Sequence, residues 1–139
     1  MERIRNYLPP IGRILLCSLF VWAGFGKLLN PAETAREFVS AGVPAAALMV
    51  WVAIVVELSG GLALLVGYKS PWVAGALAIW SLATGFAVHL AAAMHSTDPA
   101  VTFDNMIHFY KNLGLAGGLI YAVAFGAGRL SIDNWTRAR

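Results

Sequence analysis

The sequence is poor in charged residues. They make up 12% of the 139 residues, whereas about a quarter is usual for a soluble domain. Hydrophobic residues make up 59% of the chain, and its mean hydropathy is +0.70. So much apolar surface needs a solvent other than water. We therefore expect an integral membrane protein whose first partner is the lipid bilayer.

The sequence has one cysteine, Cys17, within an apolar run. A single cysteine excludes an intramolecular disulfide and a CxxC redox pair, so we expect Cys17 to be a small buried hydrophobic residue. No basic segment is interleaved with aromatic residues, so nucleic acid is not an expected partner. Glu57, His89 and His108 lack the spacing of a metal site, and none is predicted.

Four apolar stretches predict an all-α fold, an integral membrane four-helix bundle that forms one domain over residues 1–139. The N-terminus, with Arg3 and Arg5 before an apolar stretch, resembles a signal peptide, but Arg13 interrupts early and no A-x-A cleavage site precedes a polar mature domain, so the first helix is expected to remain uncleaved. Proline and glycine clusters separate the stretches, with Pro9 and Pro10 expected to stop any earlier helix. The predicted spans are about residues 11–29, 44–66, 72–94 and 105–125.

Two segments outside the spans have a pattern of their own. In residues 32–41, Ala35, Phe38 and Val39 recur at helical spacing opposite Glu33 and Glu37, which predicts a short amphipathic helix at the membrane interface. Residues 95–102 are predicted to be a polar connection and residues 126–139 a polar tail.

The basic residues are unequally divided between the two ends of the predicted bundle. One end carries Arg3, Arg5, Arg13, Lys69, Arg129, Arg137 and Arg139, and the other carries Lys27, Arg36 and Lys111. The positive-inside rule then places both termini in the cytoplasm.

Polar residues gather at one level of the fourth stretch. His108, Lys111 and Asn112 are spaced i, i+3 and i+4, so they share one helix face, and such groups are costly unless they face protein or water. His89 and Lys27 fall at a similar depth on other spans. We predict that His108, Lys111, Asn112 and Lys27 bind a ligand.

Glu57, near the middle of the second span, is the strongest single signal. A carboxylate in hydrocarbon must be paired, hydrated or protonated. Either it forms a structural ion pair, with Arg13 or with Lys27, or it exchanges protons beside a redox ligand together with His89. Lys27 reaches Glu57 only if the second span begins deeper than predicted, so Arg13 is the predicted ion-pair residue.

Other interpretations of these residues remain open. His89 and His108 could ligate a b-type haem across the bundle, although no motif demands it. The alternative without a ligand is that they are interfacial histidines, hydrogen-bonded to each other and to Asn112. Trp22 and Trp80 lie too deep for an interfacial belt, which leaves a pocket wall or core packing.

Several segments together resemble the DoxX family of small four-helix bacterial membrane proteins. Beside Arg13, these are AGFGKLLNP (23–31), ELSGGLALLVGYKSP (57–71), FAVHL (86–90), KNLGLAGGLI (111–120) and GAGRLSIDN (126–134). The resemblance implies a location in the bacterial cytoplasmic (inner) membrane and an association with redox metabolism, because a related protein is a subunit of thiosulfate:quinone oxidoreductase. The polar residues that it carries over are Arg13, Lys27, Glu57, His89, Lys111 and Asn112.

Three functions follow from these observations. The first is a redox-associated protein that binds a quinone and transfers electrons and protons with a partner protein, because the chain has no flavin, nicotinamide or iron–sulfur motif. The second is a non-enzymatic adaptor of an oxidoreductase complex. The third is a small-solute transporter, which the lack of an inverted repeat disfavours. A stripe of small residues on the fourth span also allows a homo-oligomer.

Overall fold

The computed structural model describes residues 2–138, except for the side chains of residues 2, 3 and 5. The side chains of Arg3 and Arg5, and Arg139 as a whole, which entered the charge argument, therefore lie outside the described part. The described residues form helices and no strand: α1 (Glu2–Leu29), α2 (Pro31–Ser40), α3 (Ala46–Val66), α4 (Ser70–Thr84), the π-helical turn η1 (Gly85–Leu90), α5 (Ala91–His95), α6 (Pro99–Phe125) and α7 (Ile132–Arg137). The predicted all-α class is confirmed.

Three helices are long and apolar enough to cross a membrane: Asn6–Leu29, Ala46–Val66 and the continuous rod Ser70–His95. They correspond to the first three predicted spans. The helix α6 has 27 residues, enough length to cross, but its first half carries the polar residues described above. Its role as a fourth span remains a prediction.

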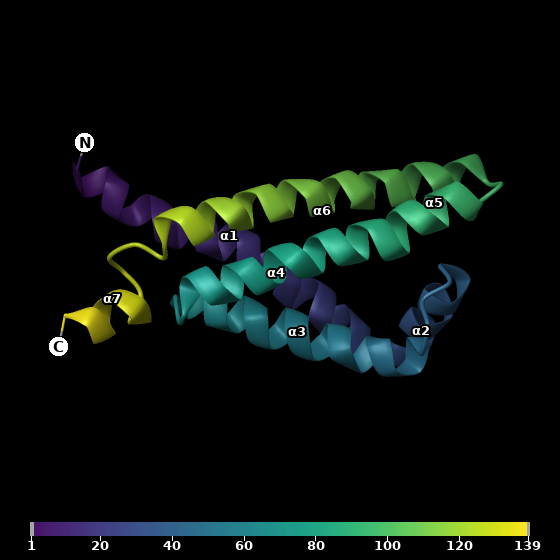
Figure 1. The fold of residues 1–139 in the computed structure, drawn as a ribbon, viewed down its shortest axis with the longest axis horizontal. Coiled ribbons are helices and arrows are strands. Elements are labelled where there is room, and N and C mark those ends of the chain that lie inside the picture. Colours follow the sequence, from purple (N-terminus) through teal and green to yellow (C-terminus); the bar gives the residue numbers. More distant parts are fainter. Residues whose placement is uncertain (1, 139) are drawn as a thin grey trace.

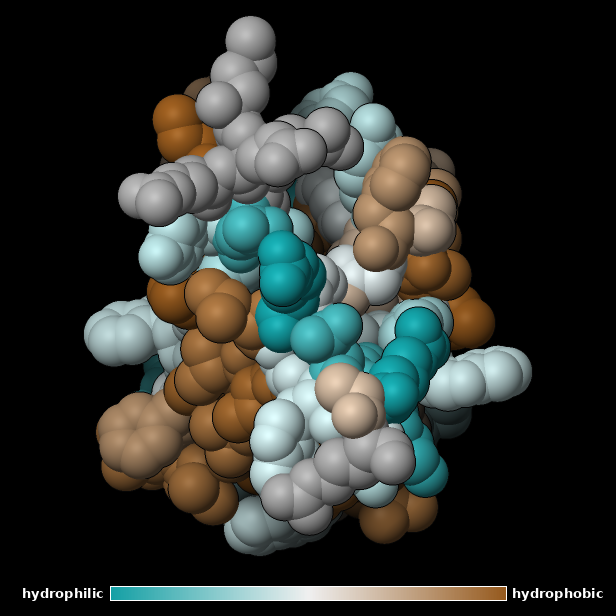
Figure 2. Space-filling view, turned by 90° about the vertical axis from the view of Figure 1, so that its left-hand side faces the viewer, coloured by the Kyte–Doolittle hydropathy of each residue, from teal (hydrophilic) through white to brown (hydrophobic). Residues whose placement is uncertain are grey.

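The long helices pack as neighbouring pairs (Figure 1). α3 lies along α1, α6 lies along α4 and η1, and α3 contacts α4, whereas α1 and α6 barely touch. Both chain ends lie at the same end of the molecule, opposite α2 (Figure 1). Viewed onto the end with the termini, hydrophilic side chains gather in the middle and hydrophobic ones surround them (Figure 2). This pattern suits a bundle whose flanks face lipid.

Close glycine contacts fix the antiparallel register of α1 and α3. A Cβ on Gly24 would lie 2.9 Å from Cγ of Leu58, and one on Gly61 would lie 3.0 Å from Cγ2 of Val21. Residue 24 is thus level with residues 57 and 58, and residue 21 with residue 61. Glycine allows this approach because it has no side chain.

The first helix begins earlier than predicted, because α1 runs through Pro9 and Pro10 rather than starting after them. Proline removes a backbone N–H but its φ is compatible with a helix, and tertiary packing outweighs the lost hydrogen bonds. Such packing exists here: a Cβ on Gly128 would lie 2.6 Å from Cβ of Pro9, so the C-terminal segment presses against this turn.

The predicted polar tail is hydrogen-bonded to the start of α4 and forms a C-terminal cap. The carboxylate of Asp133 accepts hydrogen bonds from the backbone N–H of Lys69 at 2.6 Å and of Ser70 at 2.7 Å, at the start of α4. Its own N–H donates to the carbonyl of Gly67 at 3.0 Å. Burial alone raises the pKa of Asp133, but the hydrogen bonds from Ser70 and Lys69 together outweigh it, so the pKa lies below its usual value.

The polar connection is also shorter than predicted. α6 begins at Pro99, because Asp98 caps it by accepting a hydrogen bond from the N–H of Ala100 at 2.8 Å. Proline at the first helical position and aspartate before it are typical helix starts. Only residues 96–98 separate α5 from α6.

Candidate functional site

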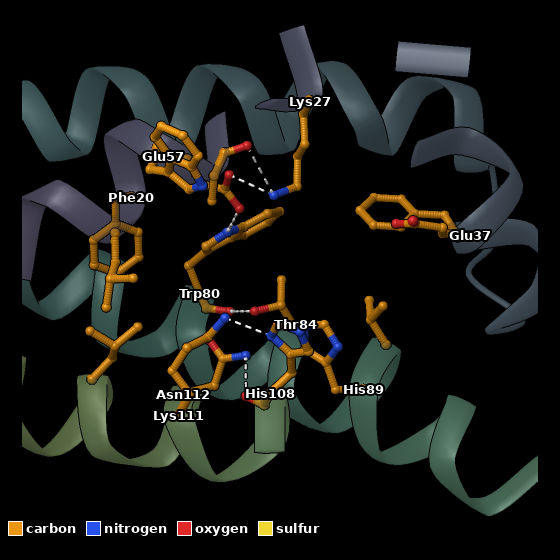
Figure 3. A pocket seen from close by; sticks show the side chains of 16 residues that line it. Phe20, Lys27, Glu37, Glu57, Trp80, Thr84, His89, His108, Lys111 and Asn112 are labelled. Atoms are coloured by element: carbon orange, nitrogen blue, oxygen red, sulfur yellow. Dashed lines mark hydrogen bonds and ion pairs between the residues drawn. The ribbon is translucent and has the colours of Figure 1, made fainter. Parts of the chain in front are cut away.

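A pocket of about 280 Å³ lies inside the bundle, in the half nearer α2 (Figure 3). Trp80 packs against both hydrophobic clusters, one centred on Leu64 and Leu77 and the other on Phe38 and Val50. The pocket's lining includes every predicted site residue except Arg13. Its apolar walls are Leu19, Phe20, Trp22, Phe38, Val88 and Leu115, and its polar lining includes Lys27, Glu57, Trp80, Thr84, His89, His108, Lys111 and Asn112.

One side of the pocket holds a buried ion pair. Nζ of Lys27 lies 2.8 Å from Oε2 of Glu57, whose side chain is 8% exposed. The indole N–H of Trp80 donates to the other carboxylate oxygen at 3.3 Å. The two donors thus satisfy both oxygens of this buried carboxylate. α1, α3 and α4 each supply one member of this group.

The prediction that Arg13 forms the ion pair with Glu57 is wrong. In the register fixed by the glycines, Arg13 lies near Gly67, ten residues along α3 from Glu57. Ten residues of helix span about 15 Å, too far for Arg13 to reach Glu57. Arg13 is buried and instead donates a hydrogen bond to the carbonyl of Leu130, which ties α1 to the C-terminal segment.

The opposite side of the pocket carries the two histidines (Figure 3). The rings of His89 and His108 stack, with centroids 5.0 Å apart and planes 20° apart. Asn112 donates its amide N–H to the carbonyl of His108 at 3.1 Å. The prediction that His108, Lys111 and Asn112 share one helix face is confirmed, because all three line the pocket from α6. His89, which belongs to η1, packs against this face.

The hydrogen bonds assign a donor or acceptor role to Nδ1 of each histidine. The ammonium of Lys111, which can only donate, lies 2.7 Å from Nδ1 of His108, so this nitrogen accepts. Nδ1 of His89 lies 3.3 Å from the amide oxygen of Asn105, whose own N–H group donates to the carbonyl of Val101. Nδ1 of His89 is therefore the donor. Its Nε2 keeps a lone pair and can accept a proton.

The π-helical turn η1 explains how His89 reaches the pocket. In a regular helix, the nine positions from Trp80 to His89 amount to about half a turn beyond two full turns, which would place them on opposite faces. A π-helix winds more slowly, and such turns occur frequently at functional sites. Both residues line the pocket. No pattern in the sequence predicts this π-helical turn.

Sequence reasoning assigns no definite site role to several residues in or beside the pocket. For Trp80 it allows either a pocket wall or core packing, although a deeply buried indole N–H needs an acceptor and Glu57 is a candidate. Asn105 positions His89. Asp104 lies 3.7 Å from Nε2 of His108 and is largely exposed. Glu37 lines the pocket from α2 (Figure 3).

Comparisons with known proteins give a consistent picture. The model of the DoxX family matches residues 8–90. The chain is 32% identical over 133 residues to the inner membrane protein YqjF of Escherichia coli K12, covering 96% of this chain and 95% of that protein. It is 30% identical over 129 residues to the inner membrane protein YphA of the same organism, covering 93% and 90%. No solved structure matches the chain.

Proposed function

The chain belongs to the DoxX family of membrane proteins, and on this premise we propose that its pocket binds a quinone-like ligand and takes part in quinone-linked electron and proton transfer with a partner protein. YqjF and YphA are named only as inner membrane proteins. The proposal therefore rests on the pocket itself.

The supporting observation is the distribution of polar groups around the pocket. Lys27, Glu57 and Trp80 lie on one side, and the histidines with Lys111 and Asn112 lie on the other (Figure 3). Apolar and aromatic side chains form the remaining walls. A quinone is a flat apolar ring with a carbonyl oxygen at either edge, and pockets of this kind pair apolar walls with a few placed polar groups. The donors of Lys27, Lys111 and Asn112 suit the carbonyl oxygens.

The chain's own residues would manage protons. A bound quinone supplies the redox chemistry by accepting two electrons and two protons. His89 has a nitrogen lone pair at Nε2, and Glu57 has a carboxyl group, so both can hold a proton and release it. The electrons would come from the partner protein.

A haem between the two histidines does not fit this arrangement. Two axial ligands need the macrocycle between their ring nitrogens. The rings of His89 and His108 stack directly, with 5.0 Å between their centroids. This spacing leaves no room for a haem.

The proposal includes a membrane topology. α6 would be the fourth span, with its polar face turned to the pocket, and α2 would lie at the interface on the outer side. Arg13 and Lys69 are hydrogen-bonded to the C-terminal segment, which also carries Arg129 and Arg137. The end with the termini (Figure 1) would then be cytoplasmic. Accessibility of cysteines introduced at residues 98 and 134 to an impermeant maleimide in spheroplasts tests this topology.

The first experiment is mass spectrometry of the protein purified in mild detergent, followed by titration with a short-chain benzoquinone. Quinones quench tryptophan fluorescence, so binding beside Trp80 reduces the emission. Trp80→Phe should reduce the quenching, with the remainder coming from Trp22, which lines the same pocket, whereas Trp72→Phe, at an exposed residue outside the pocket, should leave it unchanged.

A Glu57→Gln variant completes the test. Loss of quinone binding in a folded Glu57→Gln protein supports the proposal. Absence of any quinone after purification, together with no quenching in the wild type, would refute it. The pocket's polar groups would then be structural, as the adaptor function requires.

A further inference from the structure

The pocket opens through the side of the bundle. α1 and α6 approach one another at Leu16 and Gly118, where a Cβ on the glycine would lie 3.1 Å from the leucine Cδ2. Beyond this contact, towards α2, the two helices are separated by the pocket, which Leu19 and Trp22 line from α1 and Leu115 lines from α6. The contact thus forms the floor of a slot between α1 and α6.

The slot opens at a depth where lipid surrounds the protein. Trp22 and Leu19 line the pocket, yet 79% and 40% of their surfaces are exposed. Trp22 lies seven residues before the end of α1, which is about 10 Å along the helix. In a hydrocarbon layer about 30 Å thick, both residues face acyl chains. An apolar ligand can therefore enter from the bilayer.

Polarity changes along the slot. The deeper part of the slot is apolar and is formed by Leu16, Leu19 and Leu115. The end near α2 is polar and carries Lys27, His108 and Lys111. A ligand that satisfies both ends has a polar head and an apolar chain. A small polar solute would leave the deeper part unfilled.

We infer that the ligand class is a lipid quinone, with its ring among the polar groups and its hydrocarbon chain leaving the protein between α1 and α6 across Leu19 and Trp22. This inference rests on the proposed function and adds the chain, the side entrance and two residues that select for it. Trp22, which lines the pocket from α1, would form a wall for the chain.

The test uses two ligands with the same benzoquinone ring, one carrying a decyl chain and one without it. Their affinities are measured by fluorescence quenching for the wild type, Trp22→Ala and Trp72→Ala in one detergent. Trp72 is the matched control, because it is 81% exposed and lies outside the pocket. Comparing variants at one ligand cancels partition of that ligand into micelles.

We expect Trp22→Ala to weaken binding of the chain-bearing quinone about tenfold, through lost apolar contact. Because Trp22 also lines the pocket, binding of the chain-free quinone should weaken as well, but less than that of the chain-bearing one, and Trp72→Ala should affect neither ligand. A Leu115→Trp variant, which narrows the slot, should also weaken the chain-bearing ligand more than the chain-free one. This result would support the side entrance.

Two outcomes separate the inference from the function on which it rests. If the chain-free ring binds but Trp22→Ala and Leu115→Trp leave the affinity for the chain-bearing quinone unchanged, or weaken both quinones equally, the side entrance is refuted and the proposed function stands. If neither ring compound quenches Trp80 in any variant, the proposed function fails and the inference with it.

Discussion

The ion pair between Lys27 and Glu57 should contribute strongly to stability through the interaction of the two charges. At 2.8 Å and an effective dielectric constant of about 20, the attraction is about 6 kcal/mol before desolvation is subtracted. Lys27→Met leaves the buried Glu57 carboxylate unpaired, which typically costs about 3–5 kcal/mol, and we expect it to lower the free energy of unfolding by about 3 kcal/mol. Glu57→Gln leaves Lys27, whose side chain is 21% exposed, and should cost less because the ammonium can turn toward water.

The double variant decides whether this cost comes from the pair. Because it leaves no unpaired charge, it should cost about 3 kcal/mol less than the sum of the single variants. Unfolding by SDS in mixed micelles, followed by circular dichroism, gives each free energy. Lys111→Met combined with Glu57→Gln is the control, since Lys111 contacts His108 instead of a carboxylate.

Additivity of Lys27→Met and Glu57→Gln to within about 0.5 kcal/mol would refute the reasoning. Lys27 and Glu57 would then be solvated separately and would not stabilise the fold as a pair. Coupling as large for Lys111 as for Lys27 would also refute it. The effect would then reflect the field of the whole pocket instead of one contact.

Three further predictions concern packing and the C-terminal cap. Gly24→Ala should destabilise the protein by about 1–3 kcal/mol in the same SDS titration, because its Cβ would overlap a side chain of α3, whereas Gly26→Ala, with nothing within 4 Å, should be neutral or slightly stabilising. Asp133 has a lowered pKa in the fold, so its stabilisation is present above its unfolded pKa of about 3.9 and is lost as pH falls through the folded value; Asp133→Asn should flatten this part of the stability profile. Gly67→Ala should release the C-terminal segment to limited proteolysis, because the residue has φ +70° and its Cβ would collide with the guanidinium of Arg13.

Helix positions were predictable from the sequence because they depend on local composition. Apolar length placed the second and third spans and the end of the first to within two residues, and Asn30-Pro31 marked the boundary between α1 and α2. The misses came from tertiary contacts. The turn at Pro9 is held by the segment around Gly128, and the docking of Asp133 onto the start of α4 joins residues more than 60 positions apart. No window of sequence contains both partners.

The candidate site was predictable as a set of residues but not as a set of contacts. Depth in the membrane brought His89 to the level of His108, and helical spacing grouped His108 with Lys111 and Asn112. Which way His89 faces depends on the π-helical turn. A regular helix would have turned it away from Trp80.

The partner of Glu57 shows which physical term was missing from the sequence argument. The predicted depth of each side chain in the membrane was taken as that of its Cα atom, which placed Lys27 too far from Glu57. In a helix, however, each side chain leans toward the N-terminus and covers the turn that precedes its own Cα. Nζ of Lys27 accordingly lies 3.5 Å from the carbonyl of Ala23, at the level of Gly24 and therefore of Glu57. The same lean carries the side chain of Arg13 away from Glu57, so side-chain direction by itself favours Lys27 over Arg13 as the partner of this carboxylate.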